Sequence, residues 1–252
     1  MTDLPVQFDE RVRPDIMKRA VLSIQSKNRQ AYGNDKEAGL KHVTRWKKRN
    51  NAYRSQKGRG QSRTPRKIMM GRGSQLLGEG AEAPNTRGGS RAHGPDSDKD
   101  WTEEINDRER RKAIRSGIAA SNREKFVSEK HDYDGELPLI DDFEDVEKTS
   151  ELKDRLEELG LEDELERVKE KKVRAGRGAN RGRKYRKKVG PLLVVSGESN
   201  AVDAASNLAG VEVARVENLN AELLAPGAQP GRLVVWSEDA LEILEEEELF
   251  LD

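Results

Sequence analysis

One long stretch of the chain, residues 41–95, lacks the pattern needed to form a core of its own. Its apolar residues are few and follow neither the two-residue period of a strand nor the 3.6-residue period of a helix. Such a segment cannot offset its ordering entropy by burying apolar surface, yet a long irregular stretch inside a folded chain usually has a function. Its acids are Glu79 and Glu82, and its basic residues are Lys41, Arg45, Lys47, Lys48, Arg49, Arg54, Lys57, Arg59, Arg63, Arg66, Lys67, Arg72, Arg87 and Arg91.

This excess of positive charge favours binding to a polyanion. Nucleic acid is the polyanion whose phosphates arginine and lysine neutralise most readily. The alternative interpretation is a solvated linker that stays disordered. Composition alone leaves both interpretations open.

The charges of the whole chain balance, but they are segregated along it. The 252 residues carry 47 Lys and Arg against 47 Asp and Glu. Basic blocks lie at residues 41–91 and 169–188, and acidic blocks lie at 96–104, 132–170 and 238–252. The local blocks, and not the net charge, therefore bear on nucleic-acid binding. Aromatic residues make up 4% of the chain, so base stacking is not expected to be the main mode of binding.

Several classes of protein are disfavoured by composition. The chain has no cysteine, which excludes disulfides, cysteine zinc sites and thiol catalysis. Its three histidines, at 42, 93 and 131, are too scattered to suggest a metal cluster, so we expect neither metal nor cofactor. No apolar run has the length of a membrane span, and the first residues do not resemble a signal peptide. We expect a cytoplasmic protein without a membrane partner.

The segments around the basic stretch show ordinary folding patterns. Val6 and Phe8 alternate as in an edge strand, and a helix is predicted from Pro14 to about residue 33. A second helix is predicted over residues 107–130, begun by a capping box of Asn106 and Glu109. Its small apolar residues form a narrow stripe, and its arginines are expected to be solvated.

From residue 137 onward, the pattern is that of an α/β fold. Strands are predicted at 137–140, 192–196, 211–216 and 232–236, and helices at 149–159, 200–208, 219–224 and after Ser237. Strands that alternate with helices indicate a parallel sheet with right-handed crossovers. The acidic residues 245–248 are expected to fray. Residues 1–40 and 96–252 therefore form the predicted globular α/β domain, into which residues 41–95 are inserted as a loop.

Catalytic motifs are weak. The glycines at 78 and 80 fit a loose dinucleotide-binding pattern, but no predicted strand precedes them and no helix follows. Ser196 and Ser237 follow predicted strands, where helix capping is the stronger interpretation. An α/β enzyme that uses the carboxyl edge of the sheet remains a rival hypothesis, although we expect no enzyme.

The second basic stretch, residues 175–188, is richer in arginine, lysine and glycine. Glycine allows the backbone to approach phosphates closely, arginine binds phosphate oxygens and guanine edges, and Tyr185 could stack on an unpaired base. These features indicate an RNA-binding arm whose candidate residues are Arg177, Arg181, Arg183, Lys184, Tyr185, Arg186, Lys187 and Lys188.

The order of these motifs resembles the ribosomal protein L-four family of the large (50S/60S) subunit, in its archaeal and eukaryotic branch. The blocks that carry the resemblance are residues 57–65, 83–95, 106–120, 175–185, 207–210 and 225–235. Residues 67–82 depart from the family pattern, because they are more apolar and more acidic than expected there, and residues 94–99 stand where the family has a more basic exit from the loop.

The resemblance implies a three-layer α/β/α domain with a four-stranded parallel sheet and a long basic internal loop. It implies a structural constituent of the large subunit that binds ribosomal RNA, supports assembly and lines the nascent-peptide exit tunnel with its loop. The loop tip would lie near residues 64–75, beside large-subunit protein twenty-two and the nascent peptide, and no homo-oligomer is expected. The tunnel residues would be Arg66, Lys67 and Arg72, and His93 joins the basic residues from Arg45 to Arg91 as candidates for RNA binding. The alternative is a free RNA-binding regulator or assembly factor that acts outside the ribosome.

Overall fold

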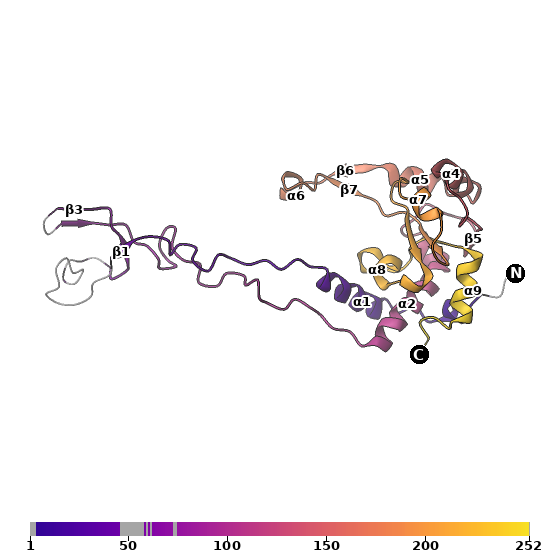
Figure 1. Ribbon diagram of the computed structural model, residues 1–252, viewed down its shortest axis with the longest axis horizontal. Helices are drawn as coiled ribbons and strands as arrows, with labels where there is room; N and C mark the ends of the chain where they lie inside the picture. The colour runs from indigo at the N-terminus through magenta and orange to yellow at the C-terminus, as the bar shows by residue number, and fades with distance from the viewer. Residues whose placement is uncertain (1–3, 46–57, 59, 61, 73–74, 252) are drawn as a thin grey trace. The chain divides into compact units, whose positions relative to one another are not determined.

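The computed structural model describes residues 4–45, 58, 60, 62–72 and 75–251 (Figure 1). The chain divides into two units. The first comprises Met1–Asn28 and Thr102–Asp252, and the second is Arg29–Trp101.

A four-stranded parallel sheet forms the centre of the first unit. Its strands are β5 (Leu139–Ile140), β8 (Leu192–Val195), β9 (Glu212–Arg215) and β10 (Val234–Trp236), in the spatial order β5-β10-β8-β9. All three neighbouring pairs are parallel, with Leu193 paired to Val235 on one side and to Val213 on the other. The four residues of β8 are all buried, as expected for a strand covered on both faces. The predicted parallel sheet is confirmed.

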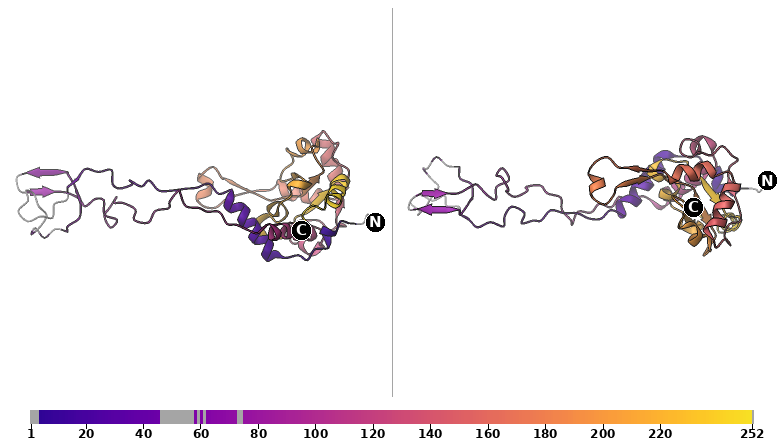
Figure 2. Two further views of the ribbon diagram at one scale, coloured as in Figure 1. Left: turned by 60° about the horizontal axis from the view of Figure 1, so that its bottom comes forward. Right: turned by 90° about the horizontal axis from the view of Figure 1, so that it is seen from above.

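Helices cover both faces of this sheet, which gives the predicted three layers (Figure 2). Leu193 and Val195 of β8 point to one face, where they pack with α4 (Thr149–Glu158), α5 (Glu162–Lys169) and α7 (Ala201–Ala205). Leu192 and Val194 point to the other face, towards α2 (Asp107–Ser121), α8 (Ala221–Leu224) and α9 (Glu238–Glu246). The alternation of neighbouring side chains along a strand produces the two cores.

Helix α1 (Pro14–Lys27) packs against α2 and α8, where its Met17, Ala20 and Val21 are buried beside alanines of the other two helices. It ends several residues earlier than predicted. The Ser23 hydroxyl donates to the carbonyl of Glu103, and the Ser26 hydroxyl accepts from the amide of Glu103. The last turn of α1 is thus bonded to the segment that precedes α2, a tertiary contact that periodicity does not encode.

The predicted N-terminal strand is wrong, because Val6–Asp9 forms a 3-10 helix, η1. Gln7 and Phe8 are both buried, whereas neighbouring residues of a strand would point to opposite faces. The Gln7 amide donates to the carbonyls of Leu244 and Leu249, and the Phe8 ring lies edge-on to Trp236 at 5.3 Å between centroids. The predicted fraying of the acidic C-terminal segment is also wrong: residues 245 and 246 belong to α9, and Leu249 is held by Gln7.

The predicted helix over residues 107–130 is divided in two. Helix α2 ends at Ser121, Arg123 adopts extended backbone angles, and α3 (Glu124–Val127) follows. Asn106 stands at the N-cap without a side-chain hydrogen bond, so the predicted capping box does not form. Arg115, predicted to be solvated, is buried and donates to Glu10 and to the Phe250 carbonyl.

The predicted helix cap at Ser237 and helix stop at Gly160 are confirmed, but Ser196 caps no helix: α7 follows Asn200, and the Ser196 hydroxyl donates to the Glu144 carboxylate at 2.6 Å. The Ser237 hydroxyl accepts from the amide of Ala240 at 3.1 Å and caps α9. Gly160 follows α4 with a φ of 80°, a left-handed conformation that favours glycine after a helix. Short 3-10 turns lie at Val216–Asn218 (η2) and Pro226–Ala228 (η3).

The second unit, Arg29–Trp101, contains two short antiparallel pairs. Strand β1 (Thr44–Arg45) pairs with β2 (Arg66–Lys67), and β3 (Met70–Arg72) pairs with β4 (Gln75–Leu77). Ala81 is the one buried apolar side chain among residues 29–45, 62–69 and 78–101. In all three views, the two halves of this unit run alongside each other (Figures 1 and 2). The loop therefore has local backbone pairing, which its sequence pattern did not predict.

The described residues contain neither a membrane-spanning helix nor a cluster of metal ligands. None of their helices is long and apolar enough to span a membrane. They also contain no group of three or more His, Asp or Glu side chains arranged to hold a metal ion.

Candidate nucleic-acid interface

The second basic stretch forms a hairpin that projects from the first unit (Figure 1). Strand β6 (Lys171–Val173) pairs antiparallel with β7 (Tyr185–Lys187), and the short helix α6 (Arg177–Asn180) lies at the tip. Every residue of both strands is exposed. Because neither strand has a buried face, the sequence shows no alternation of apolar and polar residues, and the basic arm was predicted without its strands.

Glycines shape the tip of the hairpin. Gly176 and Gly182 have φ angles of 99° and 80°, in the region that side chains other than glycine rarely adopt. The carbonyl of Gly178 accepts from the amides of Arg181 and Arg183, at 3.1 and 3.0 Å. The turn thus holds the arginine-rich tip through backbone contacts and leaves the guanidinium groups exposed.

The cations of this hairpin are largely unpaired. Lys188 lies 2.9 Å from the carboxylate of Glu170. Within the described part of the chain, none of the other predicted cations of the hairpin forms an ion pair; these are Arg177, Arg181, Arg183, Lys184, Arg186 and Lys187. Tyr185 is 46% exposed, with the Lys171 and Lys184 ammonium groups 5.9 and 5.4 Å from its ring centroid. The hairpin therefore presents uncompensated charge and one accessible aromatic ring.

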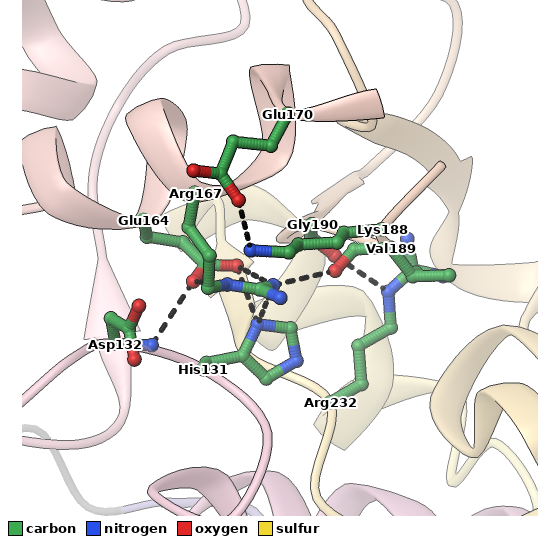
Figure 3. A network of polar contacts seen from close by, with 9 residues as sticks. All are labelled: His131, Asp132, Glu164, Arg167, Glu170, Lys188, Val189, Gly190 and Arg232. Carbon is green, nitrogen blue, oxygen red and sulfur yellow. Dashed lines mark hydrogen bonds and ion pairs between the residues drawn. The ribbon is translucent and has the colours of Figure 1, made fainter. Parts of the chain in front are cut away.

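A buried polar network lies where the hairpin joins the domain (Figure 3). Glu164 of α5 accepts from His131 Nδ1 at 2.6 Å and from Arg167 at 2.6 and 2.7 Å, and the amide of Asp132 donates to it at 3.1 Å. Burial alone would raise the pKa of Glu164, but the bonds from Arg167 and His131 lower it to about 2. Arg167 also donates to the Val189 carbonyl at 2.8 Å, so this network fixes the end of the hairpin.

A second buried cation holds the same junction from the sheet side. Arg232 is 1% exposed and donates to the carbonyl of Gly190 at 3.1 Å and to Glu212 at 2.7 Å. Burial lowers the pKa of Arg232, and the Glu212 carboxylate acts in the opposite direction. The amide of Gly190 donates to the carbonyl of Gly210 at 3.0 Å. Sequence reasoning missed this anchoring set; its one visible signal was the three-residue spacing of Glu164 and Arg167, which places them on one face of a helix.

In the second unit, cations stack on aromatic rings near its two ends. The Tyr32 and Trp101 rings are stacked with centroids 5.5 Å apart. The Arg29 guanidinium lies 4.0 Å from the Trp101 centroid, and the Lys99 ammonium lies 4.3 Å from it. Arg29 and Trp101 are 72 positions apart in sequence, so this stack joins the two halves of the unit.

Further contacts pair the two halves along their length. The amide of Asn34 donates to the Pro95 carbonyl at 2.9 Å. Gly39, with a φ of 81°, packs so closely that a Cβ atom there would lie 2.3 Å from the backbone of Gly89. The Thr44 hydroxyl donates to the Glu82 carboxylate. These contacts keep the two basic halves in a fixed register.

Only some of the predicted RNA-binding residues of the loop lie in the described part of the chain. Six of them lie outside the described residues: Lys47, Lys48, Arg49, Arg54, Lys57 and Arg59. Arg45 lies in β1 and Arg72 in β3, and Arg63 is exposed. Arg87, Arg91 and His93 are exposed and form no ion pair with another described residue.

Two of the proposed tip residues are engaged with the loop itself. The Arg66 guanidinium donates to the Gly78 carbonyl at 3.0 Å and to the Ser62 hydroxyl at 3.0 Å. The Lys67 ammonium lies 3.7 Å from Glu79. Glu79 thus compensates part of the charge near the tip.

These features define the class of the protein: an α/β/α domain with basic extensions. The chain belongs to the Ribosomal protein L4/L1 family, whose profile it matches over residues 2–247. It is 45% identical to the large ribosomal subunit protein uL4 of Nanoarchaeum equitans over 98% of this chain and 94% of that protein. It is 44% identical to uL4 of Halobacterium salinarum over 95% and 92% of the two chains, and 42% identical to uL4 of Archaeoglobus fulgidus over 97% and 92%. The family predicted from the motifs is confirmed.

Proposed function

We propose that the protein is a structural constituent of the large ribosomal subunit and binds large-subunit ribosomal RNA. Family membership is the observation that carries the proposal, since the relatives are named as large-subunit proteins. The hairpin of β6 and β7 supports RNA as the ligand, because its exposed cations have no acidic partners at the tip. The place of action is then the ribosome in the cytoplasm, and no catalytic step is assigned.

The internal loop, residues 41–95, is proposed to enter the RNA and to support assembly of the subunit. Its arginines and lysines neutralise phosphates where RNA segments approach each other, and counter-ions are released. Shape and backbone contacts then contribute more than base readout. The paired halves of the loop suit this role, since they present charge at a fixed spacing while burying almost no apolar surface.

The tip of the loop, near residues 64–75, is proposed to line the nascent-peptide exit tunnel beside large-subunit protein twenty-two. Arg66, Lys67 and Arg72 are the proposed lining residues. The antiparallel pairs β1-β2 and β3-β4 support a shaped tip over an unstructured one. Glu79 near Lys67 lowers the positive charge there, which fits contact with a passing peptide better than permanent contact with phosphate.

Limited proteolysis with trypsin, on the free protein and on purified large subunits, tests the proposal. We expect cleavage within residues 41–91 in the free protein and protection of the same sites in the subunit. Equal cleavage in both states would mean that the stretch is a surface linker, and the tunnel assignment would fail.

A second measurement separates the proposal from the free-regulator alternative. A constituent of the subunit remains with it through sedimentation in high salt, together with the other subunit proteins. Release of this protein alone at moderate salt would favour a regulator or assembly factor that acts outside the ribosome.

A further inference from the structure

A basic groove lies beside the hairpin on the first unit. It has a volume of about 1140 Å³. One wall is formed by Lys172, Arg174 and Arg186 of the hairpin, and the opposite wall by Lys130 and the turn at Gln229. A space of this size is far larger than one phosphate group requires, so it suits a stretch of an extended ligand.

The two faces of the hairpin differ in chemistry. Paired residues of an antiparallel ladder share a face, so Lys172 and Arg186 lie on one face, while Val173 and Tyr185 lie on the other. The first pair lines the groove and the second pair does not. The pair Lys171 and Lys187, on the same face as Val173 and Tyr185, also borders the groove where the hairpin joins the domain. Cations of the hairpin therefore line the groove, and its valine and tyrosine do not.

Lys130 completes the charge of the groove from the opposite wall. Its ammonium donates to the carbonyl of Gln229. Burial lowers the pKa of Lys130 to about 8, and the nearby Glu129 acts weakly in the opposite direction. A half-buried cation of this kind is stabilised when an anion approaches it. Glu170, the acid that lines the groove, is already paired with Lys188.

We propose that this groove holds one sugar–phosphate strand of RNA, between the hairpin and the turn at residues 226–229. The inference rests on the proposed function and deepens it, since it assigns a particular seat for the RNA backbone on the globular domain. Cations on both walls can contact successive phosphates of one strand, which explains why charge extends from the exposed hairpin to the half-buried Lys130. RNA fits better than an acidic peptide, because the same charged surface continues along the hairpin to the arginines of its tip.

Directed cleavage of RNA tests the placement. The chain contains no cysteine, so a single introduced cysteine can carry a tethered iron–EDTA group without a competing site. The variants are Val189→Cys and Gln229→Cys, which line the groove, and Val173→Cys on the other face of the hairpin; all three residues are exposed. The probe is large-subunit ribosomal RNA transcribed in vitro and bound to the full-length protein.

We expect the first two variants to cut an overlapping set of nucleotides, because both surround the same strand. Val173→Cys should cut a different set. If Gln229→Cys gave no cleavage while Val173→Cys cut strongly, the RNA would follow the outer face of the hairpin and the groove assignment would be overturned.

Binding measurements give an independent test. The triple variant Lys130→Met, Lys172→Met and Arg186→Met should lower the slope of log K against log salt by about 2, since each lost phosphate contact removes about 0.7–0.9. The control triple Arg13→Met, Lys148→Met and Lys153→Met removes the same charge from exposed ion pairs elsewhere and should leave the slope unchanged. Thermal melts establish that both variants are folded.

The outcomes separate the inference from the proposed function. If the unaltered protein failed to bind the RNA, the proposed function itself would fail. If it bound and the groove triple kept the full slope, the inference alone would fall. Displacement of the RNA from the groove by polyglutamate at equal charge concentration would also overturn it, in favour of an acidic peptide.

Discussion

The imidazole of His131 and the carboxylate of Glu164 lie 2.6 Å apart in the interior, 33 positions apart in sequence. Both side chains are almost fully buried, at 2% and 0% exposure. Arg167 binds the same carboxylate and reaches the carbonyl of Val189, at the foot of the basic hairpin. Through Arg167, the buried Glu164 carboxylate therefore helps to hold the foot of the basic hairpin in place (Figure 3).

This carboxylate should make stability fall at acid pH. Its pKa is about 2 in the folded protein against an ordinary 4.5, so its stabilising contribution is complete above about pH 4.5 and is lost as the pH falls towards 2. The shift corresponds to roughly 3 kcal/mol. Glu164→Gln should lower the free energy of unfolding at pH 7 by about that amount and flatten its dependence on pH between 5 and 2, measured by urea unfolding.

Glu170→Gln is the matched control, because Glu170 lies on the same segment but is exposed and pairs with Lys188 at the surface. Since an exposed ion pair of this kind contributes little, the variant should leave the stability and its dependence on pH close to those of the unaltered protein. If the free energy of unfolding depended on pH in the same way in Glu164→Gln and in the unaltered protein, the ionised Glu164 carboxylate would not stabilise the fold.

Helix packing at Gly117 gives a second prediction. A Cβ atom at Gly117 would lie 2.8 Å from Cβ of Leu224, which cannot move away without the backbone of α8. Gly117→Ala should therefore destabilise the protein by about 1–2 kcal/mol, although alanine favours a helix by about 1 kcal/mol over glycine. Chemical unfolding measures the change.

The control is Gly197→Ala, where a Cβ atom would meet nothing within 4 Å. The double variant Gly117→Ala and Leu224→Gly should lose less stability than the sum of the two single changes, because glycine removes the Cβ atom with which the new methyl group clashes. Additive losses would show that the close approach of α2 and α8 is not the cause.

Deletion of residues 64–75 should leave the first unit folded. The buried apolar clusters over and under the sheet draw all their members from Met1–Asn28 and Thr102–Asp252. We expect the same cooperative unfolding transition, with a change within about 0.5 kcal/mol. Circular dichroism during thermal unfolding is the measurement, and loss of the cooperative transition would contradict the prediction.

The sequence predicted the parts of the fold that depend on local pattern. The continuous apolar run of β8 predicted a strand buried on both faces, and Ser237 predicted the start of α9. Contacts between distant segments were not predictable in this way. The end of α1 is set by Glu103, and the inward turn of Gln7 is set by the carbonyls of Leu244 and Leu249.

For the candidate nucleic-acid interface, too, the sequence predicted local features and missed contacts between distant segments. The charge of the arm at residues 175–188 is a matter of composition, and it was visible in the sequence. Its strands were not, because Val173 and Tyr185 are exposed and no periodic apolar face marks them. The role of His131 was also hidden, since a lone histidine gives no sign of the carboxylate it meets in the folded chain.

The tip of the hairpin provides the last prediction, on RNA affinity. Arg177, Arg181 and Arg183 are exposed and form no ion pair with another described residue, so their replacement by Ala removes charge without breaking a structural contact of the side chains. The triple variant should bind large-subunit ribosomal RNA more weakly, with a salt slope lower by about 2, and should unfold at the same temperature as the unaltered protein. Filter binding over a series of salt concentrations measures the slope.

The control, in which Arg13, Lys148 and Lys153 are replaced by Ala, loses the same charge from paired surface sites and should keep the salt slope of the unaltered protein. Equal weakening in both variants would mean that net charge alone controls the affinity, and the tip would then have no particular contact with RNA.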